Sequence, residues 1–242
     1  MLKGKTYWIV GASEGLGRAL ALELDRRGVK LVLSARSKSR LEDLAATLQA
    51  PARLCVLDVS DSASVAAAVD EIGHIDGVIF AAALYEPMTA QNWNLAESEL
   101  IADVNFLGAV RVLGRVVPQF VANNAGHVAI IGSLSGYRGL PGALAYGASK
   151  AGLMHLAETI YADLWKTGVK TQLFNMGFIH TRLTAKNSFK MPFMMSPAQA
   201  ARRIANGMTT GRFKFDTPFL FSLIFRMSRG LPQFLYNRLF AK

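Results

Sequence analysis

Short apolar runs alternate along the chain with longer segments in which apolar residues recur every three or four positions. The short runs are apolar on both faces, as expected of parallel strands that are covered by helices on each side. They predict strands over Lys5–Val10, Lys30–Ala35, Arg53–Leu57, Gly77–Ala82, His127–Gly132 and Val169–Phe174. The longer segments predict helices over Leu16–Arg27, Arg40–Gln49, Ser62–Ile72, Glu97–Val121, Tyr146–Trp165 and Pro197–Met208.

Six strand-then-helix units in succession predict one doubly wound α/β domain, in which helices cover both faces of a parallel sheet. We place this domain at residues 1–211 and a C-terminal extension at residues 212–242. Arg212–Thr217 has the character of a further strand, and the rest of the extension is apolar and basic. No run of about 20 apolar residues occurs, so the pattern predicts no membrane-spanning helix.

The amino-acid composition excludes several classes of protein. Hydrophobic residues make up 51% and charged residues 18% of the chain, which excludes a disordered or fibrous protein. Cys55 is the only cysteine, so neither an internal disulfide nor a cysteine zinc site is expected, and we expect no bound metal. A cytoplasmic location follows from the single thiol and from the absence of a visible targeting segment.

The net charge of +10 is concentrated in the extension, where six cations face one acid, Asp216. No nucleic-acid motif accompanies the charge, so we do not expect a nucleic-acid partner. Gly230 and Pro232 predict that the extension breaks into two short segments. Its apolar face must be covered, and three outcomes stay open: folding back over the substrate region, packing on a second subunit, or peripheral contact with an anionic membrane surface.

A glycine-rich turn, GASEGLG, leads from the first predicted strand directly into a helix. Glycines permit a tight turn and let backbone N–H groups approach a phosphate, and the helix N-terminus adds the positive end of its dipole. The spacing differs from the commoner G-x-G-x-x-G, and a plain turn is the alternative, but the position after the first strand favours a dinucleotide site. The candidate cofactor residues in this turn are Gly11, Ser13, Gly15, Leu16 and Gly17.

The residues after the second and third predicted strands are candidates for binding the adenosine part of the cofactor. No acid occurs between Asp25 and Glu42, where an NAD site would bind the ribose 2′-hydroxyl. Arg36 stands there instead, and its planar fork suits a 2′-phosphate, so we expect NADP(H) to be favoured over NAD(H). A solvated basic turn is the alternative for Arg36, and Glu14 near the phosphate turn counts against NADP. Asp58 is placed to accept the adenine amino group; the alternative is that Asp58 or Ser60 caps the next helix.

Ser133, Tyr146 and Lys150 form the most informative constellation. Tyr146 and Lys150 lie four residues apart in a predicted helix and therefore share one face. A lysine ammonium beside a phenol favours the phenolate, so we expect the pKa of Tyr146 to fall from about 10 toward the working pH. Such a tyrosine donates a proton to a carbonyl oxygen and takes it back in reverse. Ser133, at the end of the fifth predicted strand, is placed to hydrogen-bond the same oxygen.

Together these motifs resemble the short-chain dehydrogenase/reductase family over about residues 4–208. The chain matches its N-x-x-G at Asn105, its Y-x-x-S-K at Tyr146 to Lys150, and the serine thirteen residues before that tyrosine. The resemblance implies a Rossmann-type fold and hydride transfer between NAD(P)H and a carbonyl or an alcohol. It implies that Tyr146 is the acid/base, that Lys150 holds the nicotinamide ribose, that Ser133 holds the substrate oxygen, and that Asn105 supports a water-linked proton path. Taken alone, Asn105 could equally be a polar residue that kinks a long helix.

The resemblance adds cofactor residues and also shows departures. It implies cofactor contacts at Val59, Ala82, Gly177, Ile179 and Thr181. The chain departs from the family at three places: Val10 replaces a threonine, Phe80–Ala83 replaces Asn-Asn-Ala-Gly, and Met176 replaces a proline. Because both ends of a polar link are lost together, we interpret the first two as an apolar replacement that leaves no buried donor unpaired.

The segment from Thr181 to Ser196 is rich in Met and Phe, which favours an apolar ketone or aldehyde over a sugar, unless these residues simply pack the lid. The leading interpretation is an NADP-dependent oxidoreductase acting on an apolar small molecule. The alternative is an NADP-binding regulatory or sensor protein with little turnover. The resemblance also implies a homo-oligomer, either a dimer or a tetramer.

Overall fold

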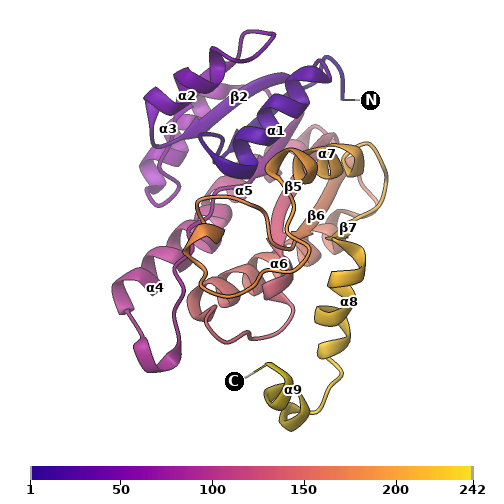
Figure 1. Cartoon of the computed structure of the whole chain (residues 1–242). Helices are drawn as coiled ribbons and strands as arrows, with labels where there is room; N and C mark the ends of the chain where they lie inside the picture. Colours follow the sequence, from indigo (N-terminus) through magenta and orange to yellow (C-terminus); the bar gives the residue numbers. More distant parts are fainter. Residues whose placement is uncertain (1, 241–242) are drawn as a thin grey trace.

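Seven parallel strands form one sheet in the computed structural model, which describes residues 2–240 (Figure 1). They are β1 (Thr6–Val10), β2 (Lys30–Ala35), β3 (Arg53–Val56), β4 (Gly77–Phe80), β5 (Gly126–Ser133), β6 (Val169–Met176) and β7 (Lys214–Thr217). Their order in the sheet is β3-β2-β1-β4-β5-β6-β7, so the chain builds outward from β1 in one direction and then in the other. The predicted doubly wound arrangement is confirmed.

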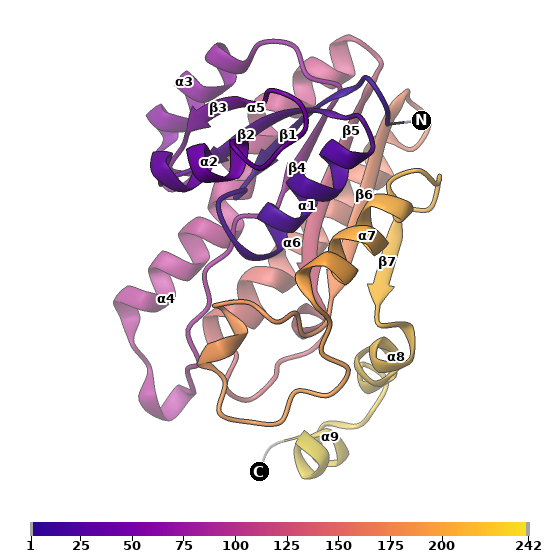
Figure 2. The same cartoon turned by 45° about the horizontal axis from the view of Figure 1, so that its top comes forward.

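Helices cover both faces of this sheet (Figure 2). One face carries α1 (Gly15–Arg26), α2 (Lys38–Ala45) and α7 (Pro197–Gly207). The other face carries α3 (Ser62–Ile72), α5 (Gly108–Ala122) and α6 (Leu144–Leu164), with α4 (Leu95–Ala102) packed against α6. The chain after β7 forms α8 (Phe219–Ser228) and α9 (Gln233–Phe240).

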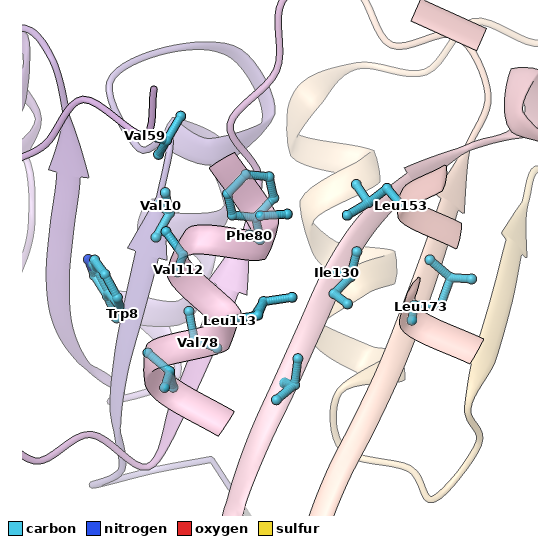
Figure 3. Packing of buried hydrophobic residues seen from close by; sticks show 14 of the residues in the cluster. Trp8, Val10, Val59, Val78, Phe80, Val112, Leu113, Ile130, Leu153 and Leu173 are labelled. Atoms are coloured by element: carbon cyan, nitrogen blue, oxygen red, sulfur yellow. The ribbon is translucent and has the colours of Figure 1, made fainter. Parts of the chain in front are cut away.

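Alternate residues of each strand pack into different cores, one on each face of the sheet. Trp8 and Val10 of β1 face the same core as Phe80 of β4, together with residues of α5 (Figure 3). Ile9, between them, faces the opposite core with residues of α1 and α7. Both faces of the strand are therefore buried, which explains why the strands are continuous apolar runs in the sequence.

Most predicted elements differ from the observed ones only at their ends, but one predicted helix is interrupted. The helix expected over Glu97–Val121 consists of α4, a π-helical segment at Asp103–Leu107, and α5. Asn105 lies in that segment, fully buried, with its side chain bonded to the backbone of Leu84. A wider turn at this point directs a polar side chain into the interior, as π-helical turns often do near functional sites.

The strand expected at Arg212–Thr217 is observed as β7, the edge strand of the main sheet. The division of the chain at residue 211 stays a prediction, although β7 lies beyond it. None of the helices within residues 2–240 combines the length and apolar character needed to cross a bilayer.

The end of the chain folds back along the body of the molecule, and α8 and α9 are separate helices as expected (Figure 1). The Tyr236 hydroxyl donates to the Gly139 carbonyl at 2.6 Å, and the Arg138 guanidinium lies 4.0 Å above the Tyr236 ring. Arg138 also donates to the carbonyls of Leu231, at 2.9 Å, and Ser228. Of the three arrangements left open by the sequence, folding back is therefore present within the chain itself.

Candidate active site

One cavity of about 840 Å³ lies at the carboxyl ends of β1 to β6. This is the edge at which open α/β sheets bind their ligands. The predicted site residues that line it are Gly11, Ser13, Gly15, Leu16, Gly17, Arg36, Asp58, Val59, Ala82, Ser133, Tyr146, Lys150, Gly177, Ile179 and Thr181. Asn105 is the single predicted site residue outside this lining.

The glycine turn brings backbone close to backbone. Gly11 has a φ of +93°, and a Cβ there would lie 2.6 Å from the Ala82 nitrogen. At Gly17 a Cβ would lie 1.9 Å from the Gly11 carbonyl oxygen. The helix that follows begins after Glu14, whose side chain does not cap it. Its first N–H groups therefore face the cavity uncapped by that side chain, and the turn fits a bound pyrophosphate.

Two arginines compensate the negative charge of Glu14, which counted against an NADP site. Arg40 and Arg182, which also line the cavity, both pair with the Glu14 carboxylate. Arg36 is exposed at the cavity and forms no ion pair within residues 2–240. A cation without a protein partner next to a neutralised acid fits a 2′-phosphate. Arg40 follows Arg36 by four residues, so the sequence could have indicated it as a partner of Glu14. Arg182 is too far away in the sequence to be found in this way.

Asp58 does not cap the following helix. Its Oδ1 accepts hydrogen bonds from the Ser60 amide at 3.0 Å and the Ser60 hydroxyl at 2.6 Å, and Asp61 caps α3 instead. Burial opposes ionisation, but these bonds from Ser60 and the nearby Arg36 and Arg111 together hold the pKa of Asp58 below its ordinary value. The carboxylate is therefore a charged acceptor on the cavity wall.

The three central side chains come from β5 and α6. Ser133 ends β5, and its Oγ lies 2.9 Å from the Ser135 Oγ. Lys150 is only 2% exposed and donates to the Ile131 carbonyl at 3.0 Å. Tyr146 lies one helical turn before it, with the Lys150 Nζ 5.9 Å from the centre of its ring. The predicted shared face of the helix is present, and both side chains reach the cavity.

The expected effect of Lys150 on Tyr146 is wrong for this structure. Burial raises the pKa of the Tyr146 phenol, and a hydrogen bond from Ser133 opposes that rise only in part. Burial also lowers the pKa of Lys150 to about 8, so the lysine carries less than a full charge in mildly alkaline solution. The Lys150 ammonium donates to the Ile131 carbonyl and lies 5.9 Å from the centre of the Tyr146 ring. At neutral pH the tyrosine therefore keeps its proton.

Asn105 lies behind the cavity and connects two of its walls. Its Oδ1 accepts from the Leu84 amide at 2.7 Å, and its Nδ2 donates to the Leu84 carbonyl at 2.9 Å and to the Ser149 hydroxyl at 3.0 Å. Ser149 in turn donates to the Tyr146 carbonyl at 2.8 Å. The Asn105 side chain thus holds the end of β4 against the helix that carries Tyr146.

Aromatic residues that the sequence did not identify as site residues form the far wall. Tyr85 meets Tyr146 edge to face, with 5.0 Å between ring centres, and its hydroxyl donates to Asn187 at 2.5 Å. The remaining aromatic lining residues come from the loop after β6 and from the tail: Phe178, Phe189, Phe221, Phe225 and Phe240. The sequence indicated this wall through the Phe and Met content of the loop, and left folding back of the tail over the substrate region as one of three outcomes.

Comparisons with known proteins place the chain in a family. The family model described as short chain dehydrogenase matches residues 5–191. An uncharacterized oxidoreductase of Myxococcus xanthus is 35% identical over 96% of this chain and 95% of its own length. The 17-beta-hydroxysteroid dehydrogenase 13 of Rattus norvegicus is 29% identical over 95% of this chain and 80% of its own length.

Solved structures show the same fold. A short-chain dehydrogenase from Sphingobium yanoikuyae in complex with NADPH superposes with a TM-score of 0.83 at 24% identity, covering 95% of this chain and 97% of that one. A closed form of serine dehydrogenase complexed with NADP⁺ gives a TM-score of 0.80 at 21% identity, covering 88% of this chain and 94% of that one. The chain therefore belongs to the short-chain dehydrogenase family, whose members are oxidoreductases that bind a nicotinamide cofactor.

Proposed function

We propose that the protein is an NADP(H)-dependent oxidoreductase that interconverts a carbonyl and an alcohol on an apolar small molecule, with Tyr146 as acid/base. One observation carries the proposal. A single cavity joins a glycine turn and a free arginine at one end, Ser133, Tyr146 and Lys150 in the middle, and an aromatic wall at the other end. The relative from Rattus norvegicus is named for a hydroxysteroid, an apolar molecule with an oxidisable hydroxyl, which supports the substrate class.

The residues fit the cofactor, because the backbone approach at Gly11 and Gly17 has no room for a side chain and Arg36 has no protein partner within residues 2–240. In the proposal the glycine turn holds the pyrophosphate, Arg36 the 2′-phosphate and Asp58 the adenine amino group. Val59, Ala82, Gly177, Ile179 and Thr181 complete the cofactor contacts, and Lys150 holds the ribose next to the nicotinamide. The bound cofactor supplies or accepts the hydride.

The protein's own groups manage the proton. The raised pKa of Tyr146 keeps the phenol protonated at neutral pH, which is the form that protonates a carbonyl oxygen during reduction. Ser133 donates a hydrogen bond to the same oxygen and so fixes its position. After transfer, the Lys150 ammonium, 5.9 Å from the ring centre, stabilises the phenolate until solvent returns a proton. We propose that Asn105 supports that path by holding Leu84 and Ser149, in line with its three hydrogen bonds.

We propose further that the enzyme is cytoplasmic, that it forms a dimer or tetramer, and that its tail contacts a membrane surface. The second candidate function, a redox sensor that binds NADP with little turnover, places the same demands on the cofactor end of the cavity. A sensor does not need Tyr146 as an acid, so a measurement of turnover distinguishes the two candidate functions.

The test is NADPH consumption over a panel of apolar aldehydes, ketones and diketones, with sugars and hydroxy acids as polar controls. We expect turnover of apolar carbonyls that exceeds turnover of the polar controls. Tight NADPH binding by fluorescence titration, with no turnover across the panel, would favour the sensor. Turnover of the polar compounds alone would contradict the substrate class and leave the oxidoreductase assignment intact.

A further inference from the structure

One face of helix α8 is buried and the opposite face is exposed. Phe221, Phe225 and Ser228 are buried against the body of the protein. Leu220 and Met227, on the opposite face, are 71% and 72% exposed. They lie seven residues apart, two helical turns along one side, so they form a continuous exposed apolar stripe together with Ile224 between them.

One flank of this stripe is a shallow basic hollow of about 560 Å³ between α8 and the sheet edge. Its cationic lining residues are Arg212, Lys214, Arg226 and Arg229. Two carboxylates reach these cations: Glu158 pairs with Lys214 at 2.6 Å, and Asp216 lies 3.9 Å from Arg226. Arg212 and Arg229 form no ion pair within residues 2–240, so the hollow presents uncompensated positive charge.

The other flank of the stripe borders the active-site cavity. Ile224 belongs both to the exposed stripe and to the cavity lining. Across from it lies the loop after β6, in which Phe189 also lines the cavity and yet is 54% exposed. Phe193 of the same loop is exposed and lies 5.6 Å from the Phe221 ring. Exposed apolar groups therefore surround the mouth of the cavity on both sides.

We propose that this surface rests on an anionic bilayer and that the apolar substrate enters the cavity directly from the lipid. The stripe and the loop phenylalanines would lie among the acyl chains, and the basic hollow among the headgroups. The entry route rests on the oxidoreductase activity proposed above, whereas the membrane contact does not.

Charge argues for lipid rather than for a second copy of the chain. The segment Pro218–Phe240 contains Arg226, Arg229 and Arg238 and no acidic residue. A two-fold interface would bring this patch against itself, arginine near arginine, which is unfavourable. Anionic headgroups complement the same patch. Helices of ten and eight residues, roughly 15 and 12 Å long, are too short to cross a bilayer and suit its interface.

Flotation of the full chain with lipid vesicles tests the contact without any enzymatic readout. We expect co-flotation with vesicles of phosphatidylcholine mixed with phosphatidylglycerol, and much less with phosphatidylcholine alone. Arg226→Gln combined with Arg229→Gln should weaken partitioning about 30-fold, since each cation near an anionic surface contributes about fivefold. Leu220→Gln combined with Met227→Gln should also release the protein, at positions too exposed to affect its folding.

Matched controls separate this surface from net charge and from general apolar exposure. Arg202→Gln with Arg203→Gln removes the same charge from the exposed side of α7, and Leu95→Gln with Leu100→Gln removes exposed leucines from α4. Both should leave flotation nearly unchanged. Equal losses in the α7 and α8 charge variants, or no flotation of the wild type at any salt concentration, would overturn the proposal. So would a dimer that the Leu220/Met227 variant turns into a monomer, because a second copy would then occupy the stripe.

A kinetic arm tests substrate entry. With an apolar ketone dissolved in the anionic vesicles, the wild type should show a lower KM than the Leu220/Met227 variant, while both turn over a water-soluble carbonyl at the same rate. Equal KM values in vesicles would overturn the entry route. Flotation without turnover of any carbonyl would instead contradict the proposed function and leave the membrane contact standing.

Discussion

The two ends of the cavity are built in different ways. The cofactor half, residues 11–59 of the lining, consists of turns that directly follow β1, β2 and β3 and presents backbone N–H groups, Arg36 and Asp58. The substrate half consists of the loop after β6 beyond Thr181 together with α8 and α9, and presents several aromatic rings. The family match ends at residue 191, before α8 begins. The turns of the cofactor half therefore lie within the family match, whereas α8 and α9, which form part of the opposite wall, lie outside it.

The largest expected effect is on kcat, for a substitution of Tyr146, which lies between the two halves of the cavity. Tyr146→Phe should lower kcat roughly 100- to 10,000-fold, because it removes the proton donor, while NADPH binding in a fluorescence titration stays nearly unchanged. Tyr85→Phe is the matched control. Tyr85 lies 5.0 Å from Tyr146, but its hydroxyl donates to Asn187 and has no role as proton donor in the proposal, so kcat should change little. Near-normal turnover in Tyr146→Phe would remove the tyrosine from the mechanism.

Within the cofactor half, Arg36→Ala should weaken NADPH binding by roughly tenfold or more and leave NADH binding unchanged, because a hydrogen bond to a charged group contributes about 1.5–3 kcal/mol. Lys38→Ala removes a neighbouring exposed cation that does not line the cavity and serves as the control. If the wild type binds NADH as tightly as NADPH, Arg36 is a solvated turn residue and the cofactor prediction is wrong.

The floor under the cofactor half is apolar, and a polar atom there should destabilise the protein. Val10 is 1% exposed and packs in the same core as Phe80 and Val59. Val10→Thr should lower the free energy of unfolding by about 1–3 kcal/mol, because the new hydroxyl has no partner. Chemical denaturation measures the change, with Val121→Thr at an exposed position as the control. An unchanged midpoint would mean that the hydroxyl finds an acceptor.

The smallest effect is expected in the substrate half. Phe189→Ala should raise KM for an apolar ketone about fivefold, since a half-exposed ring contributes about 1 kcal/mol of apolar contact, and it should not alter NADPH affinity. Trp165→Ala removes an exposed aromatic outside the cavity lining and should change neither quantity. If Arg36→Ala and Phe189→Ala each changed both the NADPH affinity and the KM, the cavity would act as one unit and the contrast between its halves would fail.

Several features of the site were accessible from sequence because they depend on neighbours along the chain. The glycine turn, the absence of an acid between Asp25 and Glu42, and the four-residue spacing of Tyr146 and Lys150 are properties of one turn, one strand end and one helix. Backbone geometry converts such spacings into positions, and parallel strands bring their carboxyl ends to one edge. The doubly wound sheet followed from the same alternation of patterns.

Other features were decided only by the tertiary structure. Glu14 is neutralised by Arg182, 168 residues away, and Asn105 is saturated by Leu84 and Ser149. The pKa of Tyr146 rises where spacing to a lysine alone predicted a fall, because burial penalises the phenolate. Desolvation and long-range packing depend on which surfaces meet in the folded chain. Sequence spacing therefore determined which groups are available for chemistry, and the fold decided their partners, their charge and the wall that the tail builds around them.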